Sequence, residues 1–299
     1  MRLATLAETT EALRATSSRK EKSELLAELL RRLDGPEIVP AIGFLLATPR
    51  QGAIGVGWAT VARLDDSDGE SNDDKTSGPA DVLAFDSLLS EIAVTTGPGS
   101  EAARTELLNR FLTRCTPAES EFVRRVLVGD ARQGALAGVM TDAVAKASGV
   151  KLASVRRAVM LRGDLGQTAT VALTEGADAV AAIDLEVGRP IQPMLASTAA
   201  DVGEAIEAIG RASVEWKLDG ARIQVHINHT DDSGDTEPTN QSDDQAGQPV
   251  RVYTRNLNDV TGRLPSVVEI AGNLACRSAV LDGEVLGFFG EDSPQAFQD

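Results

Sequence analysis

The sequence EWKLDGAR, residues 215–222, places a lysine between two acidic residues and follows them with a glycine and an arginine. Alternation of apolar and polar residues predicts one strand over 213–218 and another over 221–228. Gly220 predicts a tight turn between them, because glycine adopts backbone conformations that other residues avoid. The pattern therefore predicts two consecutive strands with ionisable side chains close to the turn.

The polar faces of these two predicted strands carry most of the reactive groups in this region. They hold Glu215, Lys217 and Asp219 on the first strand and Arg222, Gln224 and His226 on the second. Periodicity alone favours a charged face in contact with solvent. His226 and His229 would face different ways near the end of a strand, so we expect no metal-binding pair there.

Strands are also predicted over 250–255 and 279–289, which contain β-branched and aromatic residues. A short helix is predicted over 201–210. Two prolines interrupt the preceding stretch GRPIQPMLA, residues 188–196, and the composition changes there. We therefore place a domain boundary near 186–188.

The first 185 or so residues are predicted to be mostly helical. Ser18-Arg-Lys-Glu21 and Thr116-Pro-Ala-Glu119 both match the capping box, and the second also has proline at the first helical position. Gly129 marks the end of that second helix. Apolar residues at helical spacing predict further helices over 82–93, 101–113, 136–147 and 151–161.

The 299-residue chain has a formal net charge of −16, which is unusual for a protein that binds nucleic acid. Twelve of its acidic residues lie in two polar segments without Lys or Arg, residues 65–74 and 231–244, and without them the net charge is −4. We interpret both segments as solvated loops: tolerated surface insertions or, alternatively, a regulatory acidic loop. The acidity therefore does not exclude a polyanionic partner.

No stretch of about 18 apolar residues is present, which excludes a transmembrane helix. Residues 1–22 lack the apolar core and cleavage site of a secretory signal. Cys115 and Cys276 are too few for a disulfide framework and have no metal-ligand spacing. We expect a cytoplasmic protein without membrane contact.

Four stretches together resemble the ATP-dependent DNA ligases of the long, archaeal and actinobacterial type. Residues 215–222 resemble the first motif, E-x-K-x-D-G-x-R, of covalent nucleotidyltransferases, a class that also includes RNA ligases and messenger-RNA capping enzymes. Tyr253-Thr-Arg255-Asn256 resembles the second ligase motif, and Leu281-Asp-Gly-Glu284 resembles the third. Residues 188–196 resemble the beginning of the ligase catalytic domain.

The resemblance implies a multidomain protein. Residues 1–187 would form an all-α DNA-binding domain. Residues 188–299 would form the first part of an α+β nucleotidyltransferase (adenylation) domain with antiparallel sheets. The later adenylation motifs and the C-terminal OB-fold of the family are absent from the sequence, so we expect a truncated ligase that is weak or inactive alone.

The resemblance also implies a reaction. In such ligases a lysine ε-amine attacks the α-phosphorus of ATP and releases pyrophosphate. The AMP passes to the 5′-phosphate of a DNA nick, and the 3′-hydroxyl then displaces it. Lys217 is the implied nucleophile; free lysine has a pKa of about 10.4, so the site must favour the neutral amine. The implied ATP-binding residues are Glu215 for the adenine amino group, Arg222 and Arg255 for phosphate or ribose oxygens, and Glu284 for the ribose hydroxyls.

The implied substrates are ATP and nicked double-stranded DNA, in replication, repair or recombination. Mg²⁺ or another divalent metal is the implied cofactor, without an assignment of its ligands, and we expect a monomer. The helical domain resembles the family's minor-groove-binding domain, with phosphate contacts expected around 129–138. The candidate side chains are Arg132, Arg156, Arg157 and Arg162. A helix–helix turn with a solvated arginine explains the same region equally well.

Two other functions remain open. A capping-type nucleotidyltransferase shares the first motif, but the helical N-terminal part and residues 253–256 favour a DNA ligase. A non-catalytic DNA-binding remnant of a ligase is the second alternative, because the later motifs are absent. For Asp282 we expect a turn or structural role, and for Asp219 either capping of the turn or orientation of the lysine or ribose.

Overall fold

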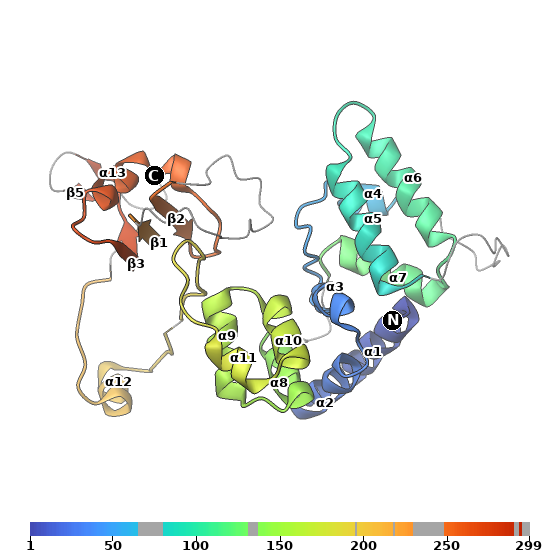
Figure 1. Ribbon diagram of the computed structural model, residues 1–299, viewed down its shortest axis with the longest axis horizontal. Coiled ribbons are helices and arrows are strands. Elements are labelled where there is room, and N and C mark those ends of the chain that lie inside the picture. Colours follow the sequence, from blue (N-terminus) through green and yellow to red (C-terminus); the bar gives the residue numbers. More distant parts are fainter. Residues whose placement is uncertain are drawn as a thin grey trace. The chain divides into compact units, whose positions relative to one another are not determined.

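A computed structural model of the chain describes residues 1–64, 80–130, 137–194, 196–217, 219–229, 248–289 and 293–294. Contacts divide the chain into two units (Figure 1). The first consists of Met1–Val159 and Asp164–Ile183, and the second of Met160–Gly163 and the chain from Asp184 onward. Both acidic segments and Arg132 lie outside the described residues.

The described part of the first unit is built of α-helices, as predicted. They are α1 (Leu3–Ala15), α2 (Arg19–Leu30), α3 (Gly35–Leu45), α4 (Trp58–Val61), α5 (Val82–Val94), α6 (Ser100–Leu112), α7 (Pro117–Leu127), α8 (Ala137–Ser148), α9 (Leu152–Arg162), α10 (Leu165–Thr174) and α11 (Ala177–Ala182). The last three residues of α9 belong to the second unit. The four helices predicted from apolar spacing correspond to α5, α6, α8 and α9, which confirms each of them to within one residue at either end.

Helix caps explain why two of these helices begin where they do. At α7 the capping box is complete: the Thr116 hydroxyl accepts from the Glu119 backbone N–H at 3.3 Å, and the Glu119 carboxylate accepts from the Thr116 N–H at 2.8 Å. At α2 only half of the predicted box forms. Ser18 accepts from the Glu21 N–H at 3.3 Å, but the Glu21 carboxylate accepts from the Thr16 hydroxyl, a competing donor just before the cap.

The core of the first unit contains a row of three phenylalanines from three helices. The ring centroids of Phe44 in α3 and Phe85 in α5 are 4.6 Å apart, and those of Phe85 and Phe111 in α6 are 5.5 Å apart. All three side chains are buried. Their burial and offset contacts hold the three helices together, because large aromatic rings contribute much of the apolar area that leaves water on folding.

The second unit contains a three-stranded antiparallel sheet in the order β2-β1-β3. Its elements are α12 (Val202–Ile209), β1 (Ala221–Asn228), β2 (Val250–Thr254), the 3₁₀ turn η1 (Thr261–Arg263), α13 (Pro265–Gly272), β3 (Ser278–Val285), and the short strand pair β4 (Phe288–Phe289) and β5 (Ser293–Pro294). The predicted helix over 201–210 and the strands over 221–228 and 250–255 are confirmed. The strand predicted over 279–289 is divided into β3 and β4.

The strand predicted over 213–218 is wrong. Residues 213–217 form no strand, and Val214 and Trp216, its expected apolar face, are 88% and 94% exposed. The physical reason lies in β1, which pairs with β2 on one edge and with β3 on the other and so offers no free edge to this segment. Alternation in the sequence does not make a strand without a ladder partner.

One face of β1 forms the small core of the second unit. Ile223, Val225 and Ile227 are buried against Val250, Val252 and Ala271. Within the described residues, no helix is both long enough and apolar enough to cross a membrane.

Candidate functional site

Residues of the three ligase-like motifs come together at one end of the sheet in the second unit. The strand register pairs Arg222 with Glu284 across β1 and β3, and Ile223 with Thr254 across β1 and β2. Arg255 directly follows Thr254, so it emerges at the same end. The antiparallel pairing therefore gathers side chains from three separated motifs at the start of β1.

Asp282 binds the Arg222 guanidinium at this end. Arg222 Nε donates to Asp282 Oδ1 at 3.0 Å, and Nη2 donates to Oδ2 at 2.7 Å. The pair stabilises both charges, so Arg222 lowers the pKa of the Asp282 carboxyl and Asp282 raises the pKa of Arg222. Asp282 lies inside β3 rather than in a turn, which corrects half of our expectation. Its structural role is an ion pair.

Glu284 and Gly220 fix the backbone just before β1. The Gly220 N–H donates to Glu284 Oε1 at 3.1 Å. A Cβ atom at position 220 would lie 2.4 Å from the Val285 carbonyl oxygen and 2.6 Å from Leu286 Cδ2. Gly220 is not among the glycines with positive φ, so it is required for close approach and not for the left-handed backbone that the sequence suggested.

Lys217 and Glu215 lie on the unpaired segment before this turn. The Lys217 side chain is 88% exposed, and its Nζ lies 3.8 Å from Asp219 Oδ1. Glu215 accepts a hydrogen bond from the Ser213 hydroxyl at 3.0 Å. Arg222, Asp282 and Glu284 thus lie on the paired strands β1 and β3. Lys217 lies on an exposed segment that leads into the same end of the sheet.

The second face of β1 is covered by residues 188–194, which we call the strap. The Gly188 N–H donates to His226 Nδ1 at 3.0 Å, the Ile191 N–H donates to Gln224 Oε1 at 3.0 Å, and Arg222 Nη1 donates to the Met194 carbonyl at 3.3 Å. Gln224 and His226 are consequently buried, at 4% and 2% exposure. The expectation of a solvated polar face is wrong for these two residues.

His226 is a neutral structural residue at the centre of this face. Burial lowers its pKa to about 4. Its ring meets the Tyr253 ring edge-on, with centroids 5.1 Å apart, and the Tyr253 hydroxyl donates to the Gly188 carbonyl. No group of three or more His, Cys, Asp and Glu side chains that could hold a metal ion occurs among the described residues.

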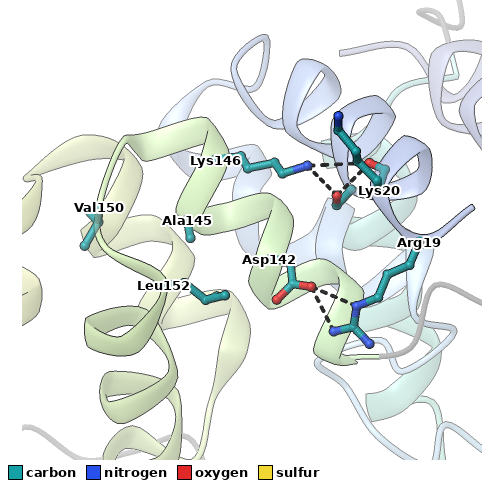
Figure 2. Close-up of a pocket in the computed structure, with 8 residues that line it drawn as sticks. Arg19, Lys20, Asp142, Ala145, Lys146, Val150 and Leu152 are labelled. Carbon is teal, nitrogen blue, oxygen red and sulfur yellow. Dashed lines mark hydrogen bonds and ion pairs between the residues drawn. The ribbon is translucent and has the colours of Figure 1, made fainter.

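A groove of about 590 Å³ lies between α2 and α8 in the first unit (Figure 2). The residues that line it are Arg19, Lys20, Ser23, Asp142, Ala145, Lys146, Val150 and Leu152. Three of them are cations, in a chain of strongly negative net charge. Sequence reasoning missed this groove, because its two walls are more than 100 residues apart in the chain.

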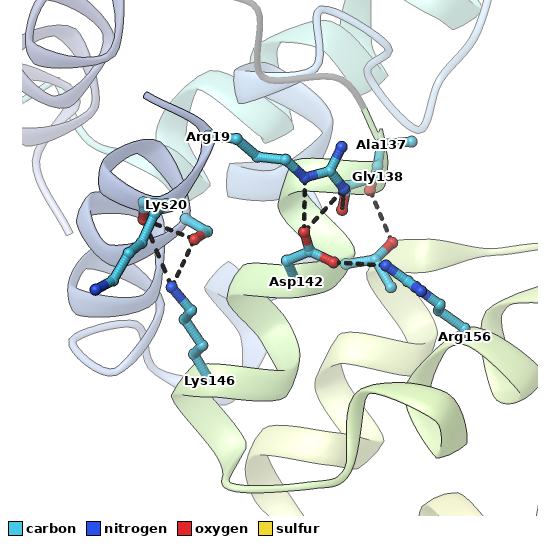
Figure 3. Close-up of polar contacts among 9 residues, drawn as sticks. Arg19, Lys20, Ala137, Gly138, Asp142, Lys146 and Arg156 are labelled. Atoms are coloured by element: carbon cyan, nitrogen blue, oxygen red, sulfur yellow. Dashed lines mark hydrogen bonds and ion pairs between the residues drawn. The ribbon is translucent and has the colours of Figure 1, made fainter. Parts of the chain in front are cut away.

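Asp142 binds one cation that lines this groove, Arg19, and a second cation beside it, Arg156 (Figure 3). Asp142 pairs with Arg19 at 2.8 Å through Oδ2 and with Arg156 at 3.1 Å through Oδ1. Lys146 Nζ donates to the Ser23 hydroxyl at 2.7 Å. Two guanidinium groups that share one carboxylate leave a net positive charge at the surface, and both are more than half exposed.

The arginines predicted to contact DNA do not form one group in the structure. Arg156 belongs to the Asp142 cluster, whereas Arg157 donates to the Ile183 carbonyl at 2.6 Å and ties α9 to the end of α11. Arg162 is the last residue of α9. Arg132 lies outside the described residues.

Comparison with known proteins connects both units to one family. The family described as DNA ligase N terminus matches residues 66–145. A protein named Probable DNA ligase from Pseudarthrobacter chlorophenolicus is 44% identical over 300 residues, which cover 100% of this chain and 54% of that protein. Proteins of the same name from Rhodococcus opacus (44% over 291 residues, 95% and 52%) and Nocardia farcinica (42% over 300 residues, 100% and 53%) are similar. The chain spans about half the length of these relatives.

Proposed function

We propose, because this chain belongs to the family of these probable DNA ligases, that it carries the DNA-binding part and the first part of the adenylation domain of an ATP-dependent DNA ligase. Residues 1–187 are the proposed DNA-binding domain, and residues 188–299 are the proposed incomplete adenylation domain. The whole ligase would seal nicks in duplex DNA through a lysyl-AMP intermediate.

The observation that carries this proposal is the meeting of three motifs at one end of the sheet. Arg222, Arg255 and Glu284 are separated by up to 62 positions in the numbering, yet the register of β1 with β2 and β3 brings them to the same end. The segment that bears Lys217 enters at this end through Gly220, which Glu284 holds. A nucleophile, two guanidinium groups and a carboxylate are groups that the transfer of a nucleotidyl group to an amine can use.

Each residue has a proposed role in that transfer. The neutral Lys217 amine forms a bond to the α-phosphorus of ATP, the bond to the pyrophosphate oxygen breaks, and the amine proton is released. Arg222 and Arg255 bind phosphate or ribose oxygens, since the guanidinium fork matches such groups. Glu215 accepts from the adenine amino group, and Glu284 accepts from the ribose hydroxyls. The AMP then passes to the 5′-phosphate at the nick, and the 3′-hydroxyl displaces it.

A divalent cation fits this end of the sheet together with the triphosphate. Mg²⁺ usually takes only one or two protein carboxylates and fills its other positions with phosphate oxygens and water. Asp219 is 75% exposed and would hold the cation together with phosphate oxygens and water, whereas Asp282 binds Arg222 and Glu284 accepts from the Gly220 N–H. When bound, the cation would neutralise charge on the leaving pyrophosphate and favour the neutral lysine.

For the helical unit, the groove between α2 and α8 is the proposed contact with DNA. Arg19, Lys20, Lys146 and Arg156 place cations from three helices on one surface, and Asp142 holds two of them in fixed orientation. Such groups bind the phosphate backbone without reading the sequence, and their contribution falls as salt rises.

A labelling experiment tests the proposed function. The chain and a chimera, in which residues 1–299 replace the matching part of the Pseudarthrobacter chlorophenolicus relative, are incubated with Mg²⁺ and ATP labelled at the α-phosphate. We expect a covalent adduct with the chimera on a denaturing gel, sealing of a nicked duplex, and no adduct with labelled GTP. A GTP adduct would support the capping-type activity instead.

Substitutions of the nucleophile provide the matched controls. Lys217→Ala removes the amine, and Lys217→Arg replaces it with a guanidinium that stays protonated, so both should abolish the adduct. Binding of nicked DNA should be retained in both variants, because the α2–α8 groove is unchanged. An adduct formed by either variant at the wild-type rate would refute the role of Lys217.

A further inference from the structure

The strap is attached to the sheet by side chains because it crosses a face of β1, whose two edges are already paired with β2 and β3. Pro190 and Pro193, which have no N–H group, also leave the strap with few backbone donors. Gln224 provides two of these attachments: its amide oxygen accepts from the Ile191 N–H, and its amide nitrogen donates to the Ile191 carbonyl. One buried side chain thus acts as a peptide group and pairs with both backbone groups of Ile191.

The order of these contacts sets the position of Met194. The strap runs opposite to β1, with Gly188 at His226, Ile191 at Gln224 and Met194 at Arg222. Gln224 is the contact next to Arg222 in this series. Its two hydrogen bonds to Ile191 therefore determine where the Met194 carbonyl meets the guanidinium.

The strap and Asp282 together limit what Arg222 can do. A guanidinium has five N–H donors. Asp282 takes two of them, and the Met194 carbonyl takes a third. Two donors remain for a ligand, and their direction is set from both sides of the guanidinium.

We propose that Gln224 is a positioning residue of the nucleotide site, which holds the strap so that Arg222 presents its two remaining N–H groups to ATP oxygens. This inference rests on the proposed function. Gln224 itself touches no substrate and acts through Ile191, Met194 and Arg222. Loss of the Gln224 amide would release Ile191 while Gly188 stays attached to His226 and Tyr253, and so would loosen one of the two restraints on the guanidinium and weaken ATP binding.

The test compares two glutamine-to-leucine variants. Gln224→Leu removes both hydrogen bonds to Ile191. Gln192→Leu makes the same chemical change within the strap itself but leaves these bonds intact, since Gln192 is exposed and contributes its backbone N–H to the Met160 carbonyl. In the 299-residue chain, hydrogen exchange of the Ile191 amide should become about tenfold faster in Gln224→Leu and stay unchanged in Gln192→Leu.

The second readout is the rate of adduct formation in the chimera at varied ATP concentration. For Gln224→Leu we expect KM for ATP to rise about tenfold while kcat changes less than threefold, because Arg222 binds ATP before the reaction. A merely structural role would lower kcat through loss of folded protein and leave KM unchanged. Gln192→Leu should match the wild type in both constants.

Three results would overturn the proposal, and they can be told apart. Unchanged exchange of the Ile191 amide in Gln224→Leu would show that Gln224 does not hold the strap. Faster exchange with unchanged KM would show that the strap does not position Arg222, with the proposed function intact. Absence of any adduct in the wild-type chimera would refute the proposed function and, with it, the binding of ATP by Arg222.

Discussion

Asp282 of β3 binds Arg222 of β1 through both carboxylate oxygens, although the strand register places Glu284 directly opposite Arg222. The long arginine side chain reaches the diagonal neighbour, a contact that is common between antiparallel strands. Glu284 is thereby free to accept from the Gly220 N–H. Two acids on one strand thus fix two different parts of the site, the guanidinium and the turn behind Lys217.

A substitution of Gly220 tests whether the close approach of the turn to β3 is needed for stability and for adduct formation. Gly220→Ala brings a Cβ atom to within 2.4 Å of the Val285 carbonyl oxygen, so the backbone must move away from β3. We expect the second unit to lose about 1–3 kcal/mol of stability and the chimera to lose most of its adduct. Gly283→Ala is the control, because a Cβ atom there meets nothing within 4 Å. Urea denaturation and the labelling gel measure both effects, and equal behaviour of the two variants would contradict this account.

Burial of His226 predicts a pH dependence of stability. Its pKa is about 4 in the folded chain, below the value of about 6.5 for an unfolded histidine. Between these values the unfolded chain binds more protons, so the contribution of His226 is complete above about pH 6.5 and is lost as the pH falls toward 4. The full effect is about 3 kcal/mol. Urea denaturation should show that the free energy of unfolding falls less from pH 7 to pH 4.5 in His226→Asn than in the wild type. The carboxylates titrate in the same way in both proteins, so the difference reports on His226.

An ion pair in the first unit should contribute clearly to stability. Asp86 is 7% exposed, and it binds Arg50 at 2.8 and 2.6 Å and accepts from the Gln51 amide at 2.8 Å. Asp86→Ala leaves these donors without their acceptor, and we expect a loss of about 2–3 kcal/mol. Glu106→Ala breaks an exposed ion pair with Arg110 on α6 and should change stability by less than about 0.5 kcal/mol. A similar loss in both variants would show that burial does not decide the contribution.

The groove between α2 and α8 should account for part of the salt dependence of DNA binding. Arg19→Gln with Arg156→Gln removes two cations from the Asp142 cluster. We expect binding of a nicked duplex to weaken about tenfold at 0.1 M salt and the slope of log Kd against log salt to fall by about 1–2.

The control for that experiment makes the same change of charge elsewhere. Arg63→Gln with Arg110→Gln removes two cations that pair with Glu101 and Glu106 on α6. Fluorescence anisotropy at several salt concentrations compares the two double variants, and thermal melting checks that both are folded. An equal loss of affinity in both would show that net charge, and not the groove, governs binding.

The sequence by itself determined the helical character of the first unit, because local signals suffice there. The cap at Thr116 and the apolar spacing of α5, α6, α8 and α9 act within a few residues of each other, and the structure follows them. The strands β1 and β2 were equally legible from alternation. The candidate site residues could also be predicted from the sequence, because the residues within each motif have a characteristic spacing.

Only the tertiary structure decided which polar residues are held and which are exposed. Alternation could not reveal that residues 213–217 find no strand partner, since both edges of β1 are taken by segments far along the chain. It could not place the strap on Gln224 and His226 or pair Arg222 with Asp282, 60 residues away. The α2–α8 groove likewise joins residues more than 100 positions apart. Such contacts depend on which surfaces meet after folding, and local periodicity records only the face on which a side chain lies, not what will cover it.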